Sequence, residues 1–540
     1  MLLFNGRIHT LDSQDRVVDA LVVRAGRVVF AGRRQDVNAP AGEPEIDLGG
    51  RAVLPGLVDA HGHLMYLARL RLTLDVAGLA SETACAERVA VRATSVRAGE
   101  WISGRGWDQN RWPGARLPTR ASLDRAAPEH PVALVRVDGH AIWASSAALR
   151  LGGIDRHTPD PDGGRLERDP SGEPTGILVD TAQELVRRVE PRPGPAQLEE
   201  AVRAAVGDCL AVGLTGVHEM GADLDALSAY HRLAAAGAFP FRNHVALRGA
   251  DPAAWQTALE DGPHAAGAGR VVVGAVKLMA DGALGSRGAA LHAPYCDDPE
   301  NRGLLLLPLD ELEARARAAA ARGFQVCVHA IGDRANTLVL DALERVLAGR
   351  PSAAGGRLAA VPGRDPRHRV EHAQILAETD IPRFRALGVL PSMQPTHCTS
   401  DMPWAEARLG ADRLPGAYAW RSLLRTGTLI AGGSDFPVEL PNPFHGIHAA
   451  VARRPRTGPD PGWQPEQRMT RAEAVRAFTA WNAYAAHQEA ALGTLEPGKW
   501  ADLVVCSADV FTCAETEIAA IEPVLTLVAG EIVLDRRAAG

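Results

Sequence analysis

The sequence has little cysteine, and its cysteines lie far apart. Seven of them occur in 540 residues, and no two form a CxxC pair. This spacing argues against a zinc ribbon and against a disulfide framework. We therefore expect buried free thiols, as in a protein of the reducing cytoplasm.

The chain also lacks an excess of basic charge and long apolar runs. Lys and Arg total 58 against 65 for Asp and Glu, and this net charge of -7 gives no basic footprint for nucleic acid or anionic membrane. No run approaches the length of a membrane span. The opening segment MLLFNGRIHTLDS has charged and turn residues too early for the apolar part of a signal peptide. We expect a cytoplasmic protein whose partner is a small-molecule substrate, with a homodimer left open.

The centre of the chain alternates strand-like and helix-like segments. Short runs rich in Val, Leu and Ile suit strands that are buried on both faces. Helix-like stretches lie between most of them, among them 196–213, 224–237, 309–323 and 416–427. A strand followed by a helix, repeated eight times, predicts an α/β fold of the (β/α)8 TIM-barrel type. The strand-like runs are 53–63, 213–221, 239–247, 271–282, 324–333, 368–374, 388–395 and 428–438.

The length of the chain predicts two or three domains. Both ends alternate apolar and polar residues in short runs, with turn pairs such as Asn5-Gly6 between them, which is β-hairpin patterning. We predict a composite β-sandwich domain from 1–55 plus 490–540, and a barrel from 56–74 plus 180–489. Residues 75–179 have their own strand signals and a stretch rich in Gly, Pro and Asp. We predict that they form an insertion after barrel strand 1 that covers the barrel mouth.

Residues that can bind a metal stand at or just after the ends of five predicted strands. His61 and His63 are two apart, so the period-two geometry of a strand points both imidazoles to one face, where they can share an ion. Taken singly, each residue has an ordinary alternative role in a loop, in the core or at a helix N-cap. Active sites of such barrels collect at the carboxyl ends of the strands, and this shared position favours a metal site. The set is His61, His63, Lys277, His329, His372 and Asp435.

Two of these residues have a second interpretation that bears on the chemistry. Lys277 lies in the apolar run VVVGAVKLMADG and could be an ordinary lysine that reaches the strand end. Alternatively, burial lowers its pKa, and the neutral amine reacts with carbon dioxide to give a carbamate that can bridge two metals. Asp435 either caps a helix or holds a metal and takes a proton from its bound water. Gly432 and Gly433 before it would let the backbone come close to a ligand.

Nine segments spread over nearly the whole chain are LFNGRIHTLD, LPGLVDAHGH, GWDQNRWPGARLPTRASLD, PVALVRVDGHAIWASSAAL, VKLMADGALGSRGA, HAIGDRA, VEHAQ, GGSDFPV and GTLEPGKWADLVV. Together they resemble the metal-dependent amidohydrolase superfamily, specifically its amidohydrolase family 3 branch, which includes N-substituted formamide deformylases. The resemblance implies a barrel plus a β-sandwich made from both termini. It also implies one or two divalent ions per chain, zinc being the first choice, with Lys277 carboxylated and bridging. The implied metal ligands are His61, His63, His329, His372 and Asp435.

These residues predict hydrolysis of an amide-like C–N bond, as in an N-substituted formamide or an N-acyl amine. Asp435 would take a proton from metal-activated water and return it to the leaving amine. His372 and His329 are candidates to hold the oxyanion, and Glu371 and Asp333 are candidates to orient the ligand imidazoles. Candidate substrate contacts are Trp107, Trp112 and His140 in the insertion, and Asp281 and Arg287 after the lysine strand.

Three other functions stay open. A deaminase on this barrel typically has a catalytic glutamate soon after the fifth-strand histidine, whereas His329 is followed by Ala-Ile-Gly-Asp. A lactone or phosphoester hydrolase could use the same binuclear centre. A catalytically silent regulatory barrel would require lost ligands, and none of the six is lost. The sequence therefore favours a C–N hydrolase over all three.

Overall fold

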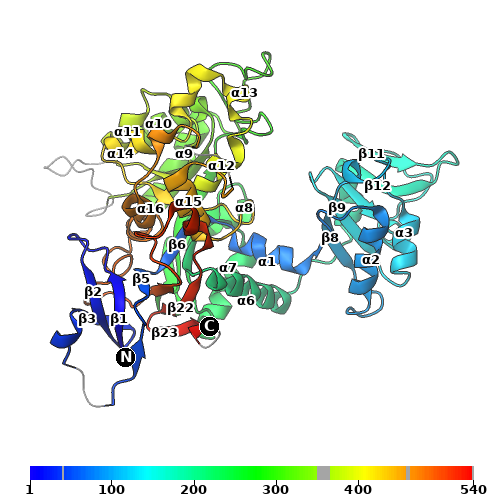
Figure 1. Cartoon of the computed structure of the whole chain (residues 1–540). Helices are drawn as coiled ribbons and strands as arrows, with labels where there is room; N and C mark the ends of the chain where they lie inside the picture. Colours follow the sequence, from blue (N-terminus) through cyan, green and yellow to red (C-terminus); the bar gives the residue numbers. More distant parts are fainter. Residues whose placement is uncertain (39–41, 349–364, 458–461, 538–540) are drawn as a thin grey trace. The chain divides into compact units, whose positions relative to one another are not determined.

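The computed structural model describes residues 1–38, 42–348, 365–457 and 462–537 (Figure 1). The chain divides into two compact units, Met1–Met65 with Ala205–Gly540, and Tyr66–Ala204. The predicted insertion, 75–179, lies within the second unit. The last three residues of the predicted 490–540 segment lie outside the described residues, as do 349–364 and 458–461 of the predicted barrel. In the described part of the chain, no helix combines the length and the apolar character that a membrane crossing requires.

A nearly closed barrel of eight parallel strands forms the body of the first unit. Its strands are neighbours in chain order, each hydrogen-bonded to the next. Six of them lie within runs that the sequence predicts as strands, and β13 and β14 extend one residue beyond theirs, so the predicted barrel is confirmed. They are β6 (Leu57–Gly62), β13 (Leu214–Ala222), β14 (Arg242–Arg248), β16 (Val271–Met279), β17 (Gln325–Ala330), β18 (Arg369–His372), β19 (Leu390–Met393) and β20 (Ala431–Gly432).

The barrel closes between its last strand and its first. The strand β20 is only two residues long, but the segment after it continues along β6. The Asp435 amide donates to the His61 carbonyl at 2.6 Å, and the His63 amide donates to the Phe436 carbonyl at 2.8 Å. These two hydrogen bonds bring the predicted ligands from the two ends of the barrel sequence to one place.

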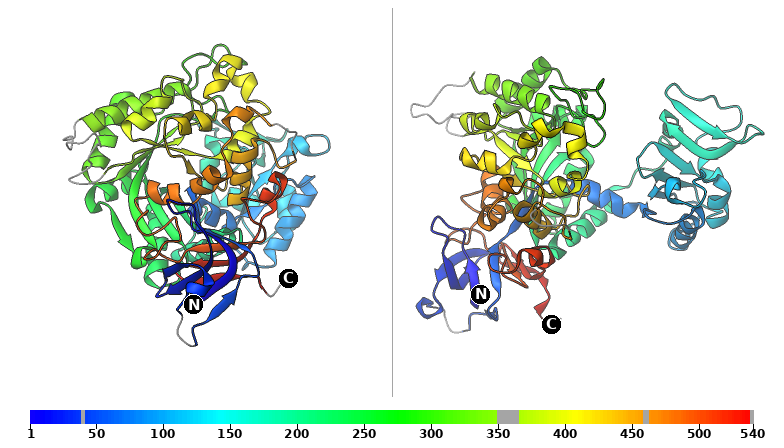
Figure 2. Two further views of the ribbon diagram at one scale, coloured as in Figure 1. Left: turned by 60° about the vertical axis from the view of Figure 1, so that its left-hand side comes forward. Right: turned by 45° about the horizontal axis from the view of Figure 1, so that its top comes forward.

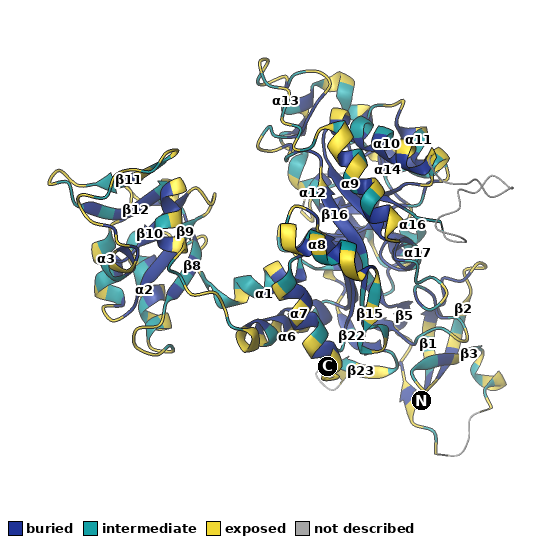
Figure 3. Cartoon of the chain, turned by 180° about the vertical axis from the view of Figure 1, so that it is seen from behind, coloured by how far each residue is buried: buried dark blue, intermediate teal, exposed yellow. Residues whose placement is uncertain are grey.

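Helices cover the outside of the strands, and α9 (Leu309–Ala321) shows how the sequence achieves this. Its buried residues are Leu312, Ala316, Ala319 and Ala320, a spacing that places them on one face of a helix. The left view of Figure 2 shows the green and yellow helices outside the barrel strands. In Figure 3, β16 is largely buried, while α8 (Pro252–Asp261) and α9 expose their outer faces. The barrel strands are therefore covered on both faces, as a parallel sheet requires.

Strands from both ends of the chain share a second sheet. It joins β1 (Leu2–His9), β2 (Val17–Arg24), β3 (Arg27–Gly32), β4 (Glu45–Asp47) and β5 (Ala52–Pro55) with β21 (Leu503–Cys506), β22 (Pro523–Val528) and β23 (Glu531–Asp535). The junction is the antiparallel pair of β5 and β21, where Val53 faces Val505. Leu3, Val53, Leu503 and Leu525 are buried in one core. The two termini thus meet as expected, while a separate two-layer sandwich domain stays a prediction.

The second unit is built on a sheet of six strands. These are β7 (Leu74–Asp75), β8 (Ile102–Trp107), β9 (Val132–Arg136), β10 (Ala141–Ala144), β11 (Gly164–Arg168) and β12 (Pro174–Asp180). Trp107, Trp112 and Trp143 pack together in its core, with ring centroids 6.2–6.3 Å apart. Their indole N–H groups donate to the carbonyls of Leu134, Leu79 and Thr119. Core packing and satisfied N–H groups account for these residues, and substrate contact by Trp107 or Trp112 stays a prediction.

Candidate active site

The six predicted metal ligands come from five barrel strands and all lie at the carboxyl ends. His61 and His63 are at the end of β6, Lys277 is near the end of β16, and His329 and His372 are near the ends of β17 and β18. Asp435 follows β20. All but His63, which is partly exposed, are buried. This end of the barrel is where active sites of the fold gather.

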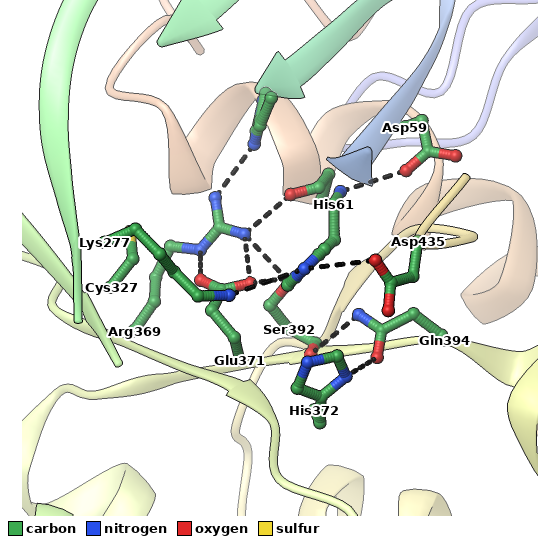
Figure 4. Close-up of polar contacts among 12 residues, drawn as sticks. Asp59, His61, Lys277, Cys327, Arg369, Glu371, His372, Ser392, Gln394 and Asp435 are labelled. Atoms are coloured by element: carbon green, nitrogen blue, oxygen red, sulfur yellow. Dashed lines mark hydrogen bonds and ion pairs between the residues drawn. The ribbon is translucent and has the colours of Figure 1, made fainter. Parts of the chain in front are cut away.

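The side chains converge, as Figure 4 shows for most of them. Lys277 Nζ is 3.5 Å from His61 Nε2. Asp435 Oδ1 is 3.6 Å from His61 Nε2 and 3.0 Å from His63 Nε2. The ring of His372 lies 4.8 Å from that of His61 and 4.5 Å from that of His329, measured between centroids. The structure therefore brings all six predicted residues together.

Three of these groups form a set that fits a divalent ion. Ligand atoms of His61, His372 and Asp435 all lie within 4.8 Å of one another, and the three residues are buried. Imidazole nitrogen and carboxylate oxygen are ligands that zinc accepts. Asp435 Oδ1 is buried, with the Nε2 atoms of His63 and His61 at 3.0 and 3.6 Å. Buried imidazole nitrogens and a carboxylate oxygen around one point form a donor set for a divalent cation, so the residues present fit a metal.

Glu371 orients the first histidine. Its Oε2 lies 2.6 Å from His61 Nδ1, so His61 donates from Nδ1 and keeps the lone pair of Nε2 for the centre of the site. Burial, and then the charge of Lys277, lowers the pKa of His61 to about 4. The imidazole is therefore neutral at pH 7, which is the state that binds a metal. The contact places Glu371 on the ring of His61, and the binding of metal by that ring stays a prediction.

Gln394 orients the second histidine, and the sequence did not reveal it. Its Oε1 lies 2.7 Å from His372 Nδ1, so this ring also donates from Nδ1 and presents Nε2. Burial holds the pKa of His372 well below its usual range. Gln394 is the N-cap residue of the short helix α12 (Pro395–Asp401). The run GVLPSMQP gave no signal for it, because a glutamine after a strand has many ordinary roles.

Asp281 holds the third histidine and the loop around it. Its Oδ1 is 3.4 Å from His329 Nε2 and accepts the Ile331 amide, while Oδ2 accepts the amides of Ala290 and Gly332. Burial lowers the pKa of His329 to about 3 and raises the pKa of Asp281 to about 7. From its buried position Asp281 thus holds the ring of His329 and the loop after β17. Its contact with substrate stays a prediction.

Lys277 is buried inside the barrel among acidic and cationic groups. Burial lowers the pKa of its amine, although Glu371 and Asp435 act in the opposite direction. The chain has only two lysines among 58 basic residues, and the other, Lys499, is in the terminal region. Nearly all other basic side chains of this chain are arginines, so a lysine at position 277 is unusual for this sequence.

Asp435 is held in a demanding backbone conformation. Its φ is 62°, and that of His372 is 73°, both in the left-handed region that residues other than glycine seldom adopt. Such angles persist where the surrounding structure imposes them, and they cluster at functional sites. Although burial opposes it, the attraction of His61 and the hydrogen bond from His63 hold the pKa of Asp435 well below its usual value. Asp435 is therefore a carboxylate at neutral pH.

Gly433, two residues before Asp435, has a structural role in the barrel. A Cβ on Gly433 would lie 2.6 Å from both Asp59 Oδ1 and the His61 amide. Asp59 accepts the amides of His61 and Ser434 and the Ser434 hydroxyl at 2.6 Å. The close approach that Gly433 permits in the structure is between β6 and the segment after β20, and an approach of this backbone to a ligand stays a prediction.

Two further residues at the site carried no sequence signal. His397 in α12 has its Nε2 3.8 Å from Asp435 Oδ2, and its ring is stacked on that of His372. Arg369 is fully buried and contacts Glu371. Neither stands at the carboxyl end of a strand, the position that identified the six candidate ligands.

Three predicted residues have other partners. Arg287 is at the surface and pairs with Asp297 at 3.0 Å. His140, in the second unit, is exposed and lies 2.9 Å from Asp180. Asp333 accepts the amides of His292 and Arg334, so it holds a loop and does not orient a ligand imidazole. Substrate contacts by Arg287 and His140 stay predictions.

A parallel barrel with buried histidines, an aspartate and a lysine at its carboxyl end defines the class of metal-dependent barrel hydrolases. Comparison with known proteins agrees, since a model of the Amidohydrolase family matches residues 44–534. The chain belongs to this family. It is accordingly a metal-dependent hydrolase that acts on carbon–nitrogen bonds.

Relatives match over nearly their whole length. "Putative amidohydrolase YtcJ" of Bacillus subtilis is 35% identical over 98% of this chain and 98% of that protein. N-substituted formamide deformylase of Arthrobacter pascens is 29% identical over 99% of this chain and 98% of that protein. The crystal structure of an uncharacterized metal-dependent hydrolase from Pyrococcus furiosus matches with a TM-score of 0.77 and 29% identity, over 95% of this chain and 99% of that one.

The contact of Gln394 with His372 gives a test of the site. Gln394→Ala should weaken zinc binding by about 10–100-fold, because the ligand ring loses the partner that fixes its orientation. Competition with a chelator measures the affinity. Gln256→Ala, at an exposed position of α8, is the matched control and should bind like the wild type. Unchanged zinc affinity in Gln394→Ala would remove His372 from the ligand set.

Proposed function

We propose that this protein hydrolyses the C–N bond of a small non-peptide amide, of the N-substituted formamide or N-acyl amine class. The observation that carries the proposal is the convergence of His61, His372 and Asp435 at the carboxyl end of the barrel. The similarity to N-substituted formamide deformylase supports the choice of substrate class. Lactone and phosphoester substrates find no comparable support.

In this proposal His61, His63, His329, His372 and Asp435 hold divalent metal, zinc being the first choice. When bound, the metal supplies water activated for attack at neutral pH and polarises the substrate carbonyl. Glu371 and Gln394 keep the rings of His61 and His372 in the tautomer that offers Nε2. The burial of these side chains excludes bulk water from the reacting groups.

Asp435 is the proton carrier of the reaction. Its carboxylate is ionised in the resting site and can accept a proton at Oδ1 or Oδ2. It takes the proton from the attacking water and returns it to the leaving nitrogen, which departs as an amine. His397, 3.8 Å from Oδ2, and the metal-ligand histidines near Oδ1 flank the two oxygens of this carboxylate.

Lys277 completes the site as a carbamate. Burial favours its neutral amine, and the neutral nitrogen can add to carbon dioxide with loss of a proton. The product is an anionic oxygen ligand next to His61. The presence of a lysine in a chain that otherwise uses arginine supports this role, because a guanidinium cannot form a carbamate.

A screen of N-formyl and N-acyl amines, with products identified, tests the substrate class. We expect equal amounts of carboxylate and amine, and a loss of about 10²–10⁴ in kcat for Asp435→Asn, which cannot carry the proton. Asp310→Asn, in the exposed first turn of α9, is the control and should keep full activity. Release of ammonia from a cyclic or amino-substituted substrate, with no amide cleaved, would instead identify a deaminase.

Substitutions of Lys277 test the carbamate. Lys277→Ala should lose metal and activity together, and added formate or acetate should restore part of both by filling the vacated ligand position. Lys277→Arg should not recover either, because its guanidinium stays protonated. Lys499→Arg applies the same change to the other lysine and should leave metal content normal. Full metal content in Lys277→Arg would show that Lys277 is an ordinary structural lysine.

A further inference from the structure

One buried arginine lies across the interior of the barrel. Arg369, at the start of β18, is fully inaccessible to solvent. Its Nη1 is 2.9 Å from His218 Nδ1 on β13, and its Nη2 donates to the Ala60 carbonyl on β6 at 2.7 Å. The same Nη2 lies 2.8 Å from Ser392 Oγ on β19. The guanidinium is therefore fixed by partners on three strands besides its own.

The same guanidinium contacts Glu371, the carboxylate that orients the ring of His61. Arg369 Nη2 donates to Glu371 Oε2 at 2.9 Å, and Arg369 Nε lies 2.8 Å from Glu371 Oε1 (Figure 4). Glu371 Oε2 is also the atom that His61 Nδ1 contacts at 2.6 Å. One oxygen thus links the anchored cation to the imidazole, and a displacement of the guanidinium moves the acceptor of His61.

A second buried arginine, Arg453, has a structural role and serves as a comparison for Arg369. Arg453, at the end of α15 (Pro443–Ala452), is equally inaccessible and donates to the backbone carbonyls of Trp463 and Tyr418. Arg369 differs because its partners include a carboxylate that itself holds a ligand. Groups that hydrogen-bond to a metal ligand commonly affect the affinity of the site for metal.

We propose that Arg369 is a positioning residue of the metal centre, which fixes Glu371 and through it the imidazole of His61. The inference rests on the proposed role of His61 as a metal ligand. A planar fork with several N–H groups is needed, because one cation must reach Glu371, Ala60, Ser392 and His218 at the same time. An ammonium at this position has three donors on one nitrogen and cannot reproduce that arrangement.

Zinc affinity of the full chain, measured by chelator competition, tests the proposal. Arg369→Lys keeps the charge and should weaken zinc binding by about 10–100-fold. Arg453→Lys makes the same chemical change at the structural tie and should keep the affinity within about twofold of the wild type. Thermal unfolding of the metal-free proteins reports stability separately, and a loss of stability alone should occur in Arg453→Lys.

A double-mutant cycle shows whether Arg369 acts through Glu371. Glu371→Gln should also weaken zinc binding, and Arg369→Lys combined with Glu371→Gln should bind about as weakly as the worse single variant. Affinity losses that multiply in the double variant would overturn the proposal, as would normal affinity in Arg369→Lys. If Arg369→Lys does not fold, Ser392→Ala removes one anchor of the fork and should still lower zinc affinity; no loss there would overturn it. Absence of zinc binding by the wild type would refute the ligand set itself.

Discussion

The structure depends on the closure of the barrel between its first and last strands. His61 and Asp435 are 374 positions apart in the sequence, yet the amide of Asp435 donates to the carbonyl of His61 at 2.6 Å. Asp59 strengthens this junction by accepting the Ser434 amide and hydroxyl, and Gly433 makes room for it because any Cβ there would collide with Asp59 and His61. His61 and Asp435 lie next to each other only when β6 and the segment after β20 are hydrogen-bonded.

Burial then determines the chemistry of the residues that the closure brings together. It lowers the pKa of His61 to about 4 and that of His329 to about 3, so the imidazoles are neutral and their nitrogens are available. It also lowers the pKa of Lys277. Buried anions are kept by specific partners, since Arg369 holds the pKa of Glu371 well below its usual range despite desolvation. The buried site therefore keeps the candidate ligand histidines neutral, and specific partners keep the carboxylate of Asp435 ionised.

The barrel and the convergence of the six candidate residues could be predicted from sequence because each of these residues stands at the end of an apolar run, and parallel strands bring such ends to one edge. Gln394, His397 and Arg369 could not be found in this way. Gln394 and His397 lie in a loop and a short helix whose position depends on tertiary packing, and Arg369 is at the opposite end of its strand. Arg287 and His140 pair with Asp297 and Asp180 in the structure, and their predicted contact with substrate stays a prediction.

We propose that the buried cluster around His61, His372 and Asp435 is a metal site. Elemental analysis of the purified chain after exhaustive dialysis tests it most directly. The account predicts one to two divalent ions per chain, about the capacity of a mononuclear or binuclear centre. A protein that hydrolyses an amide while holding no stoichiometric metal would contradict it.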